Sequence, residues 1–560
     1  MPIIFFNLIL IYAGLILYFI LKYGVDVPYN DQWEYVSFFD HLAKGNLTFN
    51  ELFKLQGEYR QLFPNLIFVG LGSLTGWNVK YEMVVIFIMA CLISWCIFYL
   101  ATRTLSVDKW QRWLVFLLAN IFIFSPCQYE NWLFGVQIEY FIPILCLTTG
   151  MVIIYSDTRA IWKLIICIVL STISTLSCVN GLICWFLLFP IYYLANRDLA
   201  FFKKSSVVYA WIIAAFIAIA IYFVNYKKPV SHPSTSLFLE NPLGAIKYFF
   251  GVLGNPLRIV HKLDVIIVVG AVLFTVFCLL VVYIIRYRRN KALVRNSIVW
   301  IMLGLYSLGT SALVTVGRLG FGLFQSLTPR YTSFSLYLIV SIFFLAAIIL
   351  KDLSQKIQFN WVYKMVITII IVLLLFNNAG KYKDSVTDLK NFHASILHGK
   401  AGLLLINSIS HETCENKIYP FEFERLQTRA ITLDSLGLLR PGLVKSNIVQ
   451  DFEAPASKTY CEGSLDTLIR IDDTSYMAKG HTKLSDTHGP ADAVLFSYDY
   501  YYGKSVLFAI CNKDSISWKK TIIINKIPFD TVLVKAWAFD ATTGKAYQIG
   551  QKQIIKNPLD

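Results

Sequence analysis

The residue with the clearest chemical potential is Asp31, which lies in a polar stretch, 22–64, between two apolar runs. This stretch holds six acids and four bases. Asn30 is a good helix N-cap, and residues 31–44 place apolar side chains at helical spacing before a stop at Gly45. Asp31 would then lie in the first turn, where the helix dipole favours a carboxylate. The pattern predicts a small structure on the membrane surface with an acid at its tip.

A second group of polar residues, 125–139, interrupts apolar sequence. It includes the carboxylates Glu130 and Glu139 and the amides Asn131 and Gln137. Such groups at a membrane boundary are costly unless they face a cavity or one another. The pattern therefore indicates either a cavity wall or, equally well, a capped helix end with an aromatic residue at the interface.

A third group, 317–331, contains Arg318 and Arg330 among glycines. Arginine makes planar bidentate contacts with phosphate, and glycine lets backbone N–H groups approach an anion. The two arginines are therefore candidate phosphate ligands. The alternative is that they pair with the acids of the first polar stretch.

Motifs of soluble enzymes are missing from the sequence, which has no P-loop, no GxSxG and no HExxH. His232 and His261 stand alone and are read as interfacial residues rather than ligands. Three cysteines, Cys414, Cys461 and Cys511, lie in the polar final third, where they allow one disulfide.

Composition indicates the class of protein in which these groups lie. The 560 residues are 56% hydrophobic and only 15% charged, with a mean hydropathy of +0.58. These values are typical of a polytopic membrane protein. The net charge of +15 does not indicate nucleic acid, because the bases lie in short loops between apolar runs, as membrane orientation requires.

Eleven apolar runs have roughly the length that spans a bilayer. They lie at residues 3–21, 80–101, 113–127, 137–154, 161–177, 181–196, 206–224, 264–286, 297–316, 332–350 and 363–378. The stretch 64–77 is apolar but short, which favours an interfacial or re-entrant segment.

Alternate loops between these runs carry the bases, which predicts that those loops face the cytoplasm. The opposite side then receives the Asp31 loop, residues 128–136, 178–180, 225–263 and 317–331, and everything after residue 379. We expect a transmembrane domain over 1–379, a mixed helical and irregular connector over 380–462, and a β-sandwich over 463–560, where short Val- and Ile-rich runs alternate with turn residues.

Four short motifs occur in order on the predicted outer side. They are Asp31-Gln32-Trp33, Glu58-Tyr59-Arg60 with Pro64, Glu130-Asn131-Trp132 with Gly135 and Gln137, and Gly317-Arg318 with Gly322, Gln325 and Arg330-Tyr331. With the many spans and the C-terminal domain, this set resembles the GT-C superfamily of integral-membrane glycosyltransferases. It is most similar to a bacterial subgroup that includes the phage-type O-antigen glucosyltransferases.

The resemblance implies an α-helical polytopic fold, GT-C-like, and transfer of a sugar from a polyprenyl-phosphate donor. It makes Asp31 the catalytic base and Arg318, Arg330 and Tyr331 the ligands of the donor phosphate. Eight residues would contact substrate: Gln32, Trp33, Glu58, Arg60, Glu130, Asn131, Gln137 and Gln325. Related sequences often have histidine where this chain has Tyr59, so a metal or substrate role at that position is in doubt. No cofactor is firmly implied, and a divalent cation is compatible with the acids.

The implied partners are the polyprenyl-phosphate-sugar donor, a lipid-linked glycan acceptor of the O-antigen or lipopolysaccharide type and membrane lipids, with a flippase and a donor-making synthase acting alongside. The implied location is a bacterial inner membrane, with the C-terminal domain in the periplasm. Two other classes stay open: a lipid-linked glycan polymerase or ligase, and a non-catalytic polysaccharide assembly or transport protein. Spans nearly free of charge in their middles disfavour proton-coupled transport.

Overall fold

The chain forms two compact units in the computed structural model. The membrane unit comprises Met1–Gly24, Thr48–Leu71 and Lys80–Leu389, and the tail unit comprises Val25–Leu47, Gly72–Val79 and Lys390–Asp560. The structure describes residues 2–57, 59–196, 205–227, 232–257, 262–354, 361–409, 416–455, 461–472, 475–484, 489–499, 503–511, 516–523 and 531–556.

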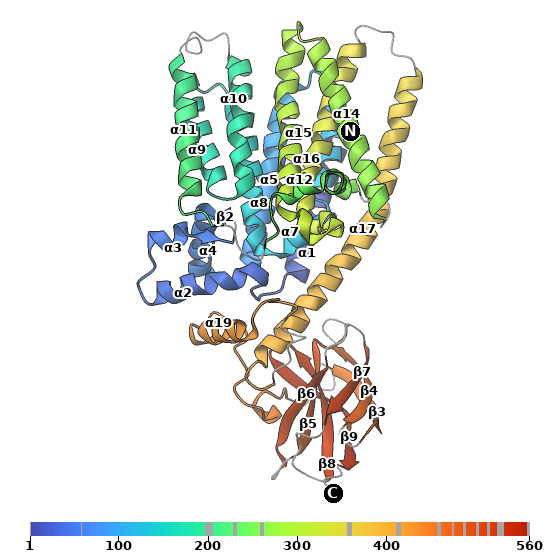
Figure 1. Ribbon diagram of the computed structural model, residues 1–560. Coiled ribbons are helices and arrows are strands. Elements are labelled where there is room, and N and C mark those ends of the chain that lie inside the picture. The colour runs from blue at the N-terminus through green and yellow to red at the C-terminus, as the bar shows by residue number, and fades with distance from the viewer. Residues whose placement is uncertain are drawn as a thin grey trace. The chain divides into compact units, whose positions relative to one another are not determined.

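Long helices make up most of the membrane unit and run side by side (Figure 1). They are α1 (Pro2–Tyr23), α5 (Lys80–Thr104), α6 (Lys109–Ile123), α8 (Ile138–Tyr155), α9 (Ala160–Thr175), α10 (Ile183–Asn196), α11 (Ser205–Phe223), α14 (Leu263–Arg286), α15 (Lys291–Arg318), α16 (Thr332–Ser354) and the first part of α17 (Trp361–Leu404). Each of the eleven predicted apolar runs lies largely in one of these helices.

Eight helices in the described part of the chain are long and apolar enough to cross a membrane. The segments 160–175 and 179–194 are apolar but shorter, as is α4 (Leu62–Thr75). The prediction of a multi-pass membrane protein is therefore confirmed, while the count of eleven spans stays a prediction.

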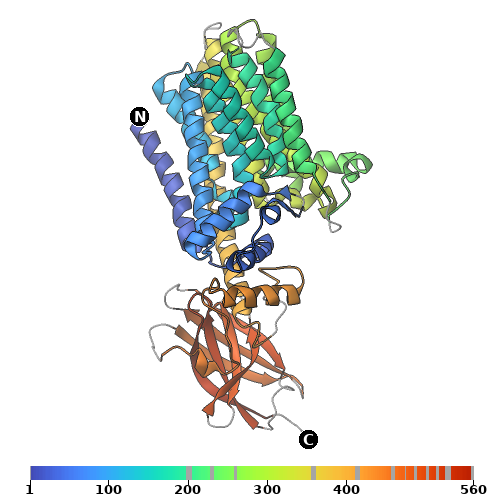
Figure 2. The same cartoon turned by 90° about the vertical axis from the view of Figure 1, so that its left-hand side faces the viewer.

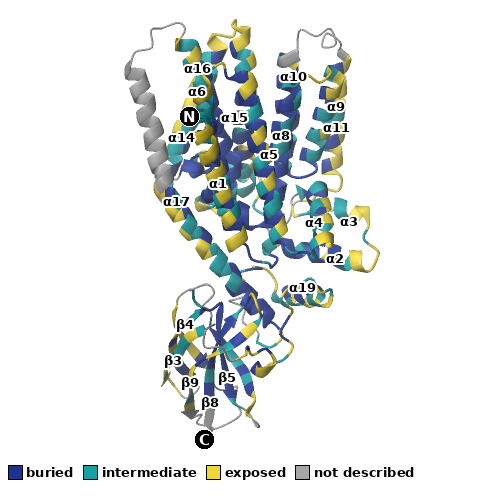
Figure 3. Cartoon of the chain, turned by 180° about the vertical axis from the view of Figure 1, so that it is seen from behind, coloured by how far each residue is buried: buried dark blue, intermediate teal, exposed yellow. Residues whose placement is uncertain are grey.

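Burial separates inner from outer helices in this unit. The apolar windows of α8 and α16 are 78% and 72% buried, whereas that of α14 is 17% buried. Figure 3 shows the same contrast between the dark blue of α8 and the exposed residues along α1. Apolar residues on an outer face suit contact with lipid rather than water.

Shorter helices complete the membrane unit. They are α3 (Phe49–Phe53), α7 (Tyr129–Leu133), α12 (Leu237–Glu240) and α13 (Pro242–Gly254), with the 3-10 turns η2 (Pro126–Gln128), η3 (Gly135–Gln137), η4 (Val179–Leu182), η6 (Asn255–Leu257), η7 (Leu319–Phe321), η8 (Leu323–Leu327) and η9 (Pro329–Tyr331), and with the two-residue strands β1 (Leu55–Gln56) and β2 (Tyr59–Arg60).

The first polar stretch begins differently from its prediction. Residues Asn30–Tyr35 form a 3-10 turn, η1, and the α-helix α2 covers only Val36–Ala43. Asn30 is not the N-cap, because its own backbone has a positive φ of 49° and Tyr29 precedes the turn. Gly45 does end the helix, with φ of 70°.

The tail unit joins this stretch to distant residues. The Glu34 carboxylate pairs with Arg425 (2.7 Å) and Arg429, both on α19 (Phe423–Ser435). The backbone N–H of Asn30 also donates to the Ile418 carbonyl at 2.7 Å. Residues near the N-terminus thus pack with residues about 390 positions later.

Seven strands form two antiparallel sheets in the same unit (Figure 2). One sheet has the order β3-β4-β7 and the other β6-β5-β8-β9. The strands are β3 (Cys461–Arg470), β4 (Ser475–Leu484), β5 (Ala493–Asp499), β6 (Ser505–Cys511), β7 (Ser517–Ile523), β8 (Thr531–Asp540) and β9 (Lys545–Lys556). Phe496 and Trp518, from different sheets, share one buried core, so the expected sandwich is present. Cys461 and Cys511 are free thiols, and Cys414 lies outside the described residues.

Candidate functional site

Arg318 is the last residue of α15 in the membrane unit. Beyond it the chain makes three 3-10 turns before α16 begins at Thr332. The carbonyl end of a helix carries partial negative charge, which favours a cation there. Gly322, with φ of 97°, allows the sharp change of direction between the first two turns.

Two side chains from other segments contact the Arg318 guanidinium. Its Nη1 lies 3.2 Å from Nδ1 of His232, and its Nη2 donates to the Tyr59 hydroxyl at 3.3 Å. The segment of His232 comes close because Gly320 has no side chain: a Cβ there would lie 2.3 Å from Pro233. His232 is therefore not isolated, which corrects the expectation that it stands alone.

A cavity of about 190 Å³ opens beside this guanidinium. Arg318 and Tyr331 both line it, as does Asn180. Six lining side chains carry hydroxyl groups: Tyr59, Tyr140, Tyr226, Thr235, Thr310 and Tyr331. A guanidinium surrounded by hydroxyl and amide groups can bind an anion that also carries sugar hydroxyls.

Glu130 and Asn131 meet Arg330 next to this cavity. The Asn131 amide donates to the Arg330 carbonyl at 3.2 Å, and the Glu130 carboxylate interacts with both the backbone and the guanidinium of Arg330. The Arg330 guanidinium also lies 5.7 Å from the centre of the Tyr331 ring. Residues about 200 positions apart thus form one polar patch.

Several buried oxygens in this part of the membrane unit have no hydrogen-bond partner within the described structure. They belong to Glu130 (Oε2), Asn131 (Oδ1), Gln137 (Oε1), Asn180 (Oδ1) and Gln325 (Oε1). An unpaired buried acceptor costs about 1–3 kcal/mol. Asn180 lines the cavity, so its free oxygen can accept a hydrogen bond from a ligand there. Glu130, Asn131, Gln137 and Gln325 are not among the residues that line this cavity.

Arg60 has a different role from the predicted substrate contact. Its guanidinium donates to the carbonyls of Phe53 (2.6 Å), Tyr222 (3.0 Å) and Val224, and it is 3% exposed. Burial lowers its pKa, although interaction with Tyr222 opposes the shift. Arg60 thus ties the C-terminal end of α11 to the segment that carries Tyr59.

Asp31, Gln32 and Trp33 belong to the tail unit. Asp31 is exposed, whereas Trp33 is fully buried. The Gln32 side chain accepts from the Tyr29 amide at 3.1 Å and so caps η1. The buried Trp33 side chain and the Gln32 hydrogen bond therefore stabilise the turn in which Asp31 lies exposed. Glu58 lies outside the described residues.

Sequence reasoning missed three residues of this site: Tyr59, Asn180 and His232. In the sequence, Tyr59 departs from the motif of related proteins, Asn180 lies in a stretch, 177–181, that reads as a tight turn, and His232 stands alone. The useful signal was polarity on the same predicted side of the membrane as Arg318, which all three share.

No group of three His, Cys, Asp or Glu side chains that could hold a metal ion occurs within the described ranges.

A larger apolar groove of about 620 Å³ lies among α4, α5, α8 and α9 of the same unit. Its walls include Phe63, Trp95 and Ile142. Phe63 is four residues from Tyr59, and Ile142 is two residues from Tyr140. An apolar groove and a polar cavity are thus built from neighbouring stretches of chain.

The chain matches no family model, no curated protein and no solved structure.

Proposed function

We propose that this protein is an integral-membrane glycosyltransferase that moves a sugar from a polyprenyl-phosphate donor to a cell-surface glycan of the O-antigen type, in a bacterial inner membrane. The observation that carries the proposal is the cavity beside Arg318, where a guanidinium faces hydroxyl and amide groups within a membrane-spanning unit. The donor has matching parts: an anionic phosphate, a sugar and an apolar chain.

Each part of the donor has a matching region. The phosphate binds Arg318, whose donors are oriented by Tyr59 and His232. The sugar hydroxyls donate to unpaired oxygens such as Asn180 Oδ1. The isoprenoid chain lies in the apolar groove lined by Phe63 and Ile142, where apolar burial stabilises it by about 0.8 kcal/mol for each CH₂ group.

The chemical step needs a leaving group and a base. Arg318 stabilises the charge that grows on the departing phosphate as the bond between sugar and phosphate breaks. The base is assigned to Asp31 from the resemblance of its motif to the GT-C superfamily: Asp31 is exposed in the tail unit, and as a base it would accept the proton of the acceptor hydroxyl. With Asp31 as a base rather than a nucleophile, a single displacement inverts the anomeric carbon.

Donor binding tests the phosphate site. Arg318→Lys keeps the charge but loses the planar fork, so purified full-length protein should bind a polyprenyl phosphate about tenfold more weakly, equivalent to about 1.4 kcal/mol. The matched control is Arg289→Lys, at an exposed position beyond the far end of α15. Equal affinity in wild type and Arg318→Lys would remove Arg318 from the phosphate site.

A further inference from the structure

A second cavity lies at the other end of the membrane unit from Arg318. It is lined by Lys291 and Arg295, in the first turns of α15, whereas Arg318 ends that helix. A helix of 28 residues is about 42 Å long. This cavity is therefore separate from the candidate donor site and is not needed for the function proposed above.

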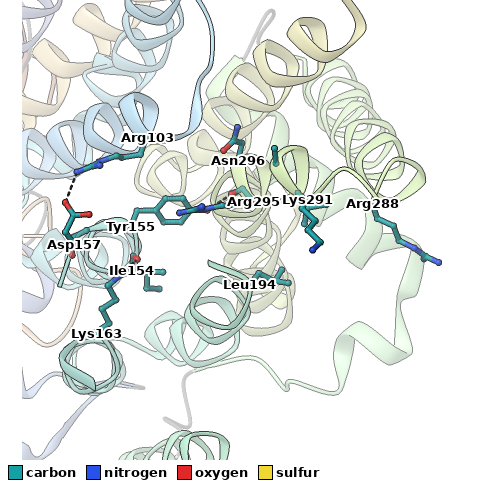
Figure 4. Close-up of a pocket in the computed structure, with 13 residues that line it drawn as sticks. Arg103, Ile154, Tyr155, Asp157, Lys163, Leu194, Arg288, Lys291, Arg295 and Asn296 are labelled. Carbon is teal, nitrogen blue, oxygen red and sulfur yellow. Dashed lines mark hydrogen bonds and ion pairs between the residues drawn. The ribbon is translucent and has the colours of Figure 1, made fainter. Parts of the chain in front are cut away.

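The cavity has a volume of about 620 Å³ and a strongly basic wall (Figure 4). Five cationic side chains line it, from four segments of the chain: Arg103, Lys163, Arg288, Lys291 and Arg295. One carboxylate, Asp157, accompanies them. A wall with this imbalance of charge attracts anions.

The single carboxylate offsets little of that charge. Asp157 lies 3.6 Å from Arg103, and its side chain is 93% exposed. An exposed pair of this kind contributes about 0–1 kcal/mol. Lys291 and Arg295 have no ion pair with any residue that the structure describes, so their charges remain available.

The helices around the cavity are fixed by hydrogen bonds that do not use the side chains of Lys291 and Arg295. The Tyr155 hydroxyl donates to the Arg295 carbonyl, joining α8 to α15. Lys163 is 7% exposed, and its Nζ donates to the Ile154 carbonyl at 2.8 Å, joining α9 to α8. The cavity is therefore built into the packing of the helix ends.

The start of α15 adds partial positive charge to the same place. The Asn290 side chain accepts from the Leu293 amide at 3.1 Å, which caps the helix just before Lys291. Backbone N–H groups and the dipole at a helix N-terminus favour phosphate. Membrane orientation alone explains why bases lie in these loops, but not why they converge on one cavity.

We propose that this cavity binds a phosphate-bearing anion. Arg295 supplies a planar fork for phosphate oxygens, and Lys291 supplies a point charge. Two features favour the headgroup of an anionic phospholipid as the source. Trp162, next to Lys163, is 53% exposed, as suits the membrane interface, and apolar residues such as Leu194 contribute to the cavity wall. A soluble phosphate compound has the same recognition chemistry.

Lipid binding to the purified full-length protein in neutral detergent tests this inference. Native mass spectrometry would count bound phosphatidylglycerol, with phosphatidylcholine as the neutral lipid, and calorimetry would measure inorganic pyrophosphate. The test variant is Lys291→Gln/Arg295→Gln. The control is Arg286→Gln/Arg289→Gln, which removes two exposed charges nearby that do not line the cavity.

Wild type should bind phosphatidylglycerol or pyrophosphate more tightly than phosphatidylcholine, and the test variant should lose roughly thirtyfold in affinity, since each of the two basic residues contributes about fivefold to sixfold. Preference for the lipid identifies a membrane source, and preference for pyrophosphate identifies a soluble one. The charge-retaining variant Lys291→Arg keeps both charges and leaves the Arg295 fork in place, so it should bind like wild type. The inference fails if wild type binds neither anion selectively, if the control loses as much affinity, or if the charge-retaining variant loses it too.

Discussion

At the scale of single residues, Arg318 owes its setting to segments far apart in the sequence. Tyr59 and His232 contact it from positions 259 and 86 residues away. Residue types alone make Arg318 a candidate phosphate ligand, because arginine on the predicted outer side runs against the usual charge pattern. They do not reveal its neighbours, because no local period or motif links residues that only the packing of helices brings together.

Asp492 is a residue whose charge state should affect the stability of the sandwich. It is buried, and its Oδ2 accepts from the Ala541 amide at 2.8 Å. Burial raises the pKa of this carboxyl to about 7, above its ordinary value in an unfolded chain of about 4. Between these values the folded state binds more protons than the unfolded state, so stability falls as pH rises, by at most about 1.4 kcal/mol per pH unit.

Hydrogen exchange of residues 536–541 in the full-length protein measures this effect. After correction for intrinsic exchange, protection in wild type should decrease from pH 5 to pH 8. Asp492→Asn keeps an acceptor for the Ala541 amide but cannot ionise, so its protection should stay nearly constant across that range. The same decrease in both proteins would show that Asp492 does not set the pH dependence.

At the scale of elements, the sequence predicts helices well where a membrane dictates them. Each long apolar run forms a helix because lipid leaves backbone groups no partner outside the segment. The short strands β5, β6 and β8 also follow their apolar runs. The prediction for the start of the first polar stretch was wrong, because the 3-10 turn η1 stands where an N-capped α-helix was expected. Its backbone is held by the distant carbonyl of Ile418, a tertiary contact that local propensity does not report.

The close packing of α13 against α14 depends on glycine. A Cβ at Gly254 would lie 2.0 Å from the Ile266 carbonyl oxygen, and one at Gly270 would lie 1.9 Å from that of Phe250. Gly254→Ala should therefore push the helices apart and destabilise the protein by about 1–3 kcal/mol, lowering the midpoint of thermal unfolding in detergent. Gly14→Ala is the control, because nothing lies within 4 Å of that position. Equal midpoints for the two variants would contradict such close packing.

At the scale of the whole molecule, the sequence separated an apolar helical part from a β-rich tail but did not foresee how the chain is shared between compact units. Residues 25–47 group with the tail rather than with the helices that flank them in sequence. The ion pairs of Glu34 with Arg425 and Arg429 contribute to that grouping. Hydropathy predicts the membrane helices, and turn residues predict the strands. Neither predicts that the loop 25–47 packs with α19.

Membrane orientation is a prediction for the whole chain. An impermeant thiol reagent added to intact cells should label Phe324→Cys, whose position is 75% exposed, and should not label Asn290→Cys, which is exposed next to the basic loop. Wild type provides the background from its own eleven cysteines, and broken cells should label both variants. Labelling of Asn290→Cys in intact cells would reverse the orientation.

The most direct test of the proposed glycosyltransferase is sugar transfer in membranes that contain the full-length protein. A radiolabelled polyprenyl-phosphate sugar is supplied with a lipid-linked glycan acceptor, and wild type is compared with Asp31→Asn and with the control Asp40→Asn, which removes a nearby carboxylate paired with Lys44. Wild type and Asp40→Asn should transfer the label, and Asp31→Asn should be slower by about 10²–10⁴-fold at equal abundance. Transfer by Asp31→Asn at the wild-type rate would contradict its role as the base, and failure of wild type with every such donor and acceptor would contradict the proposed activity.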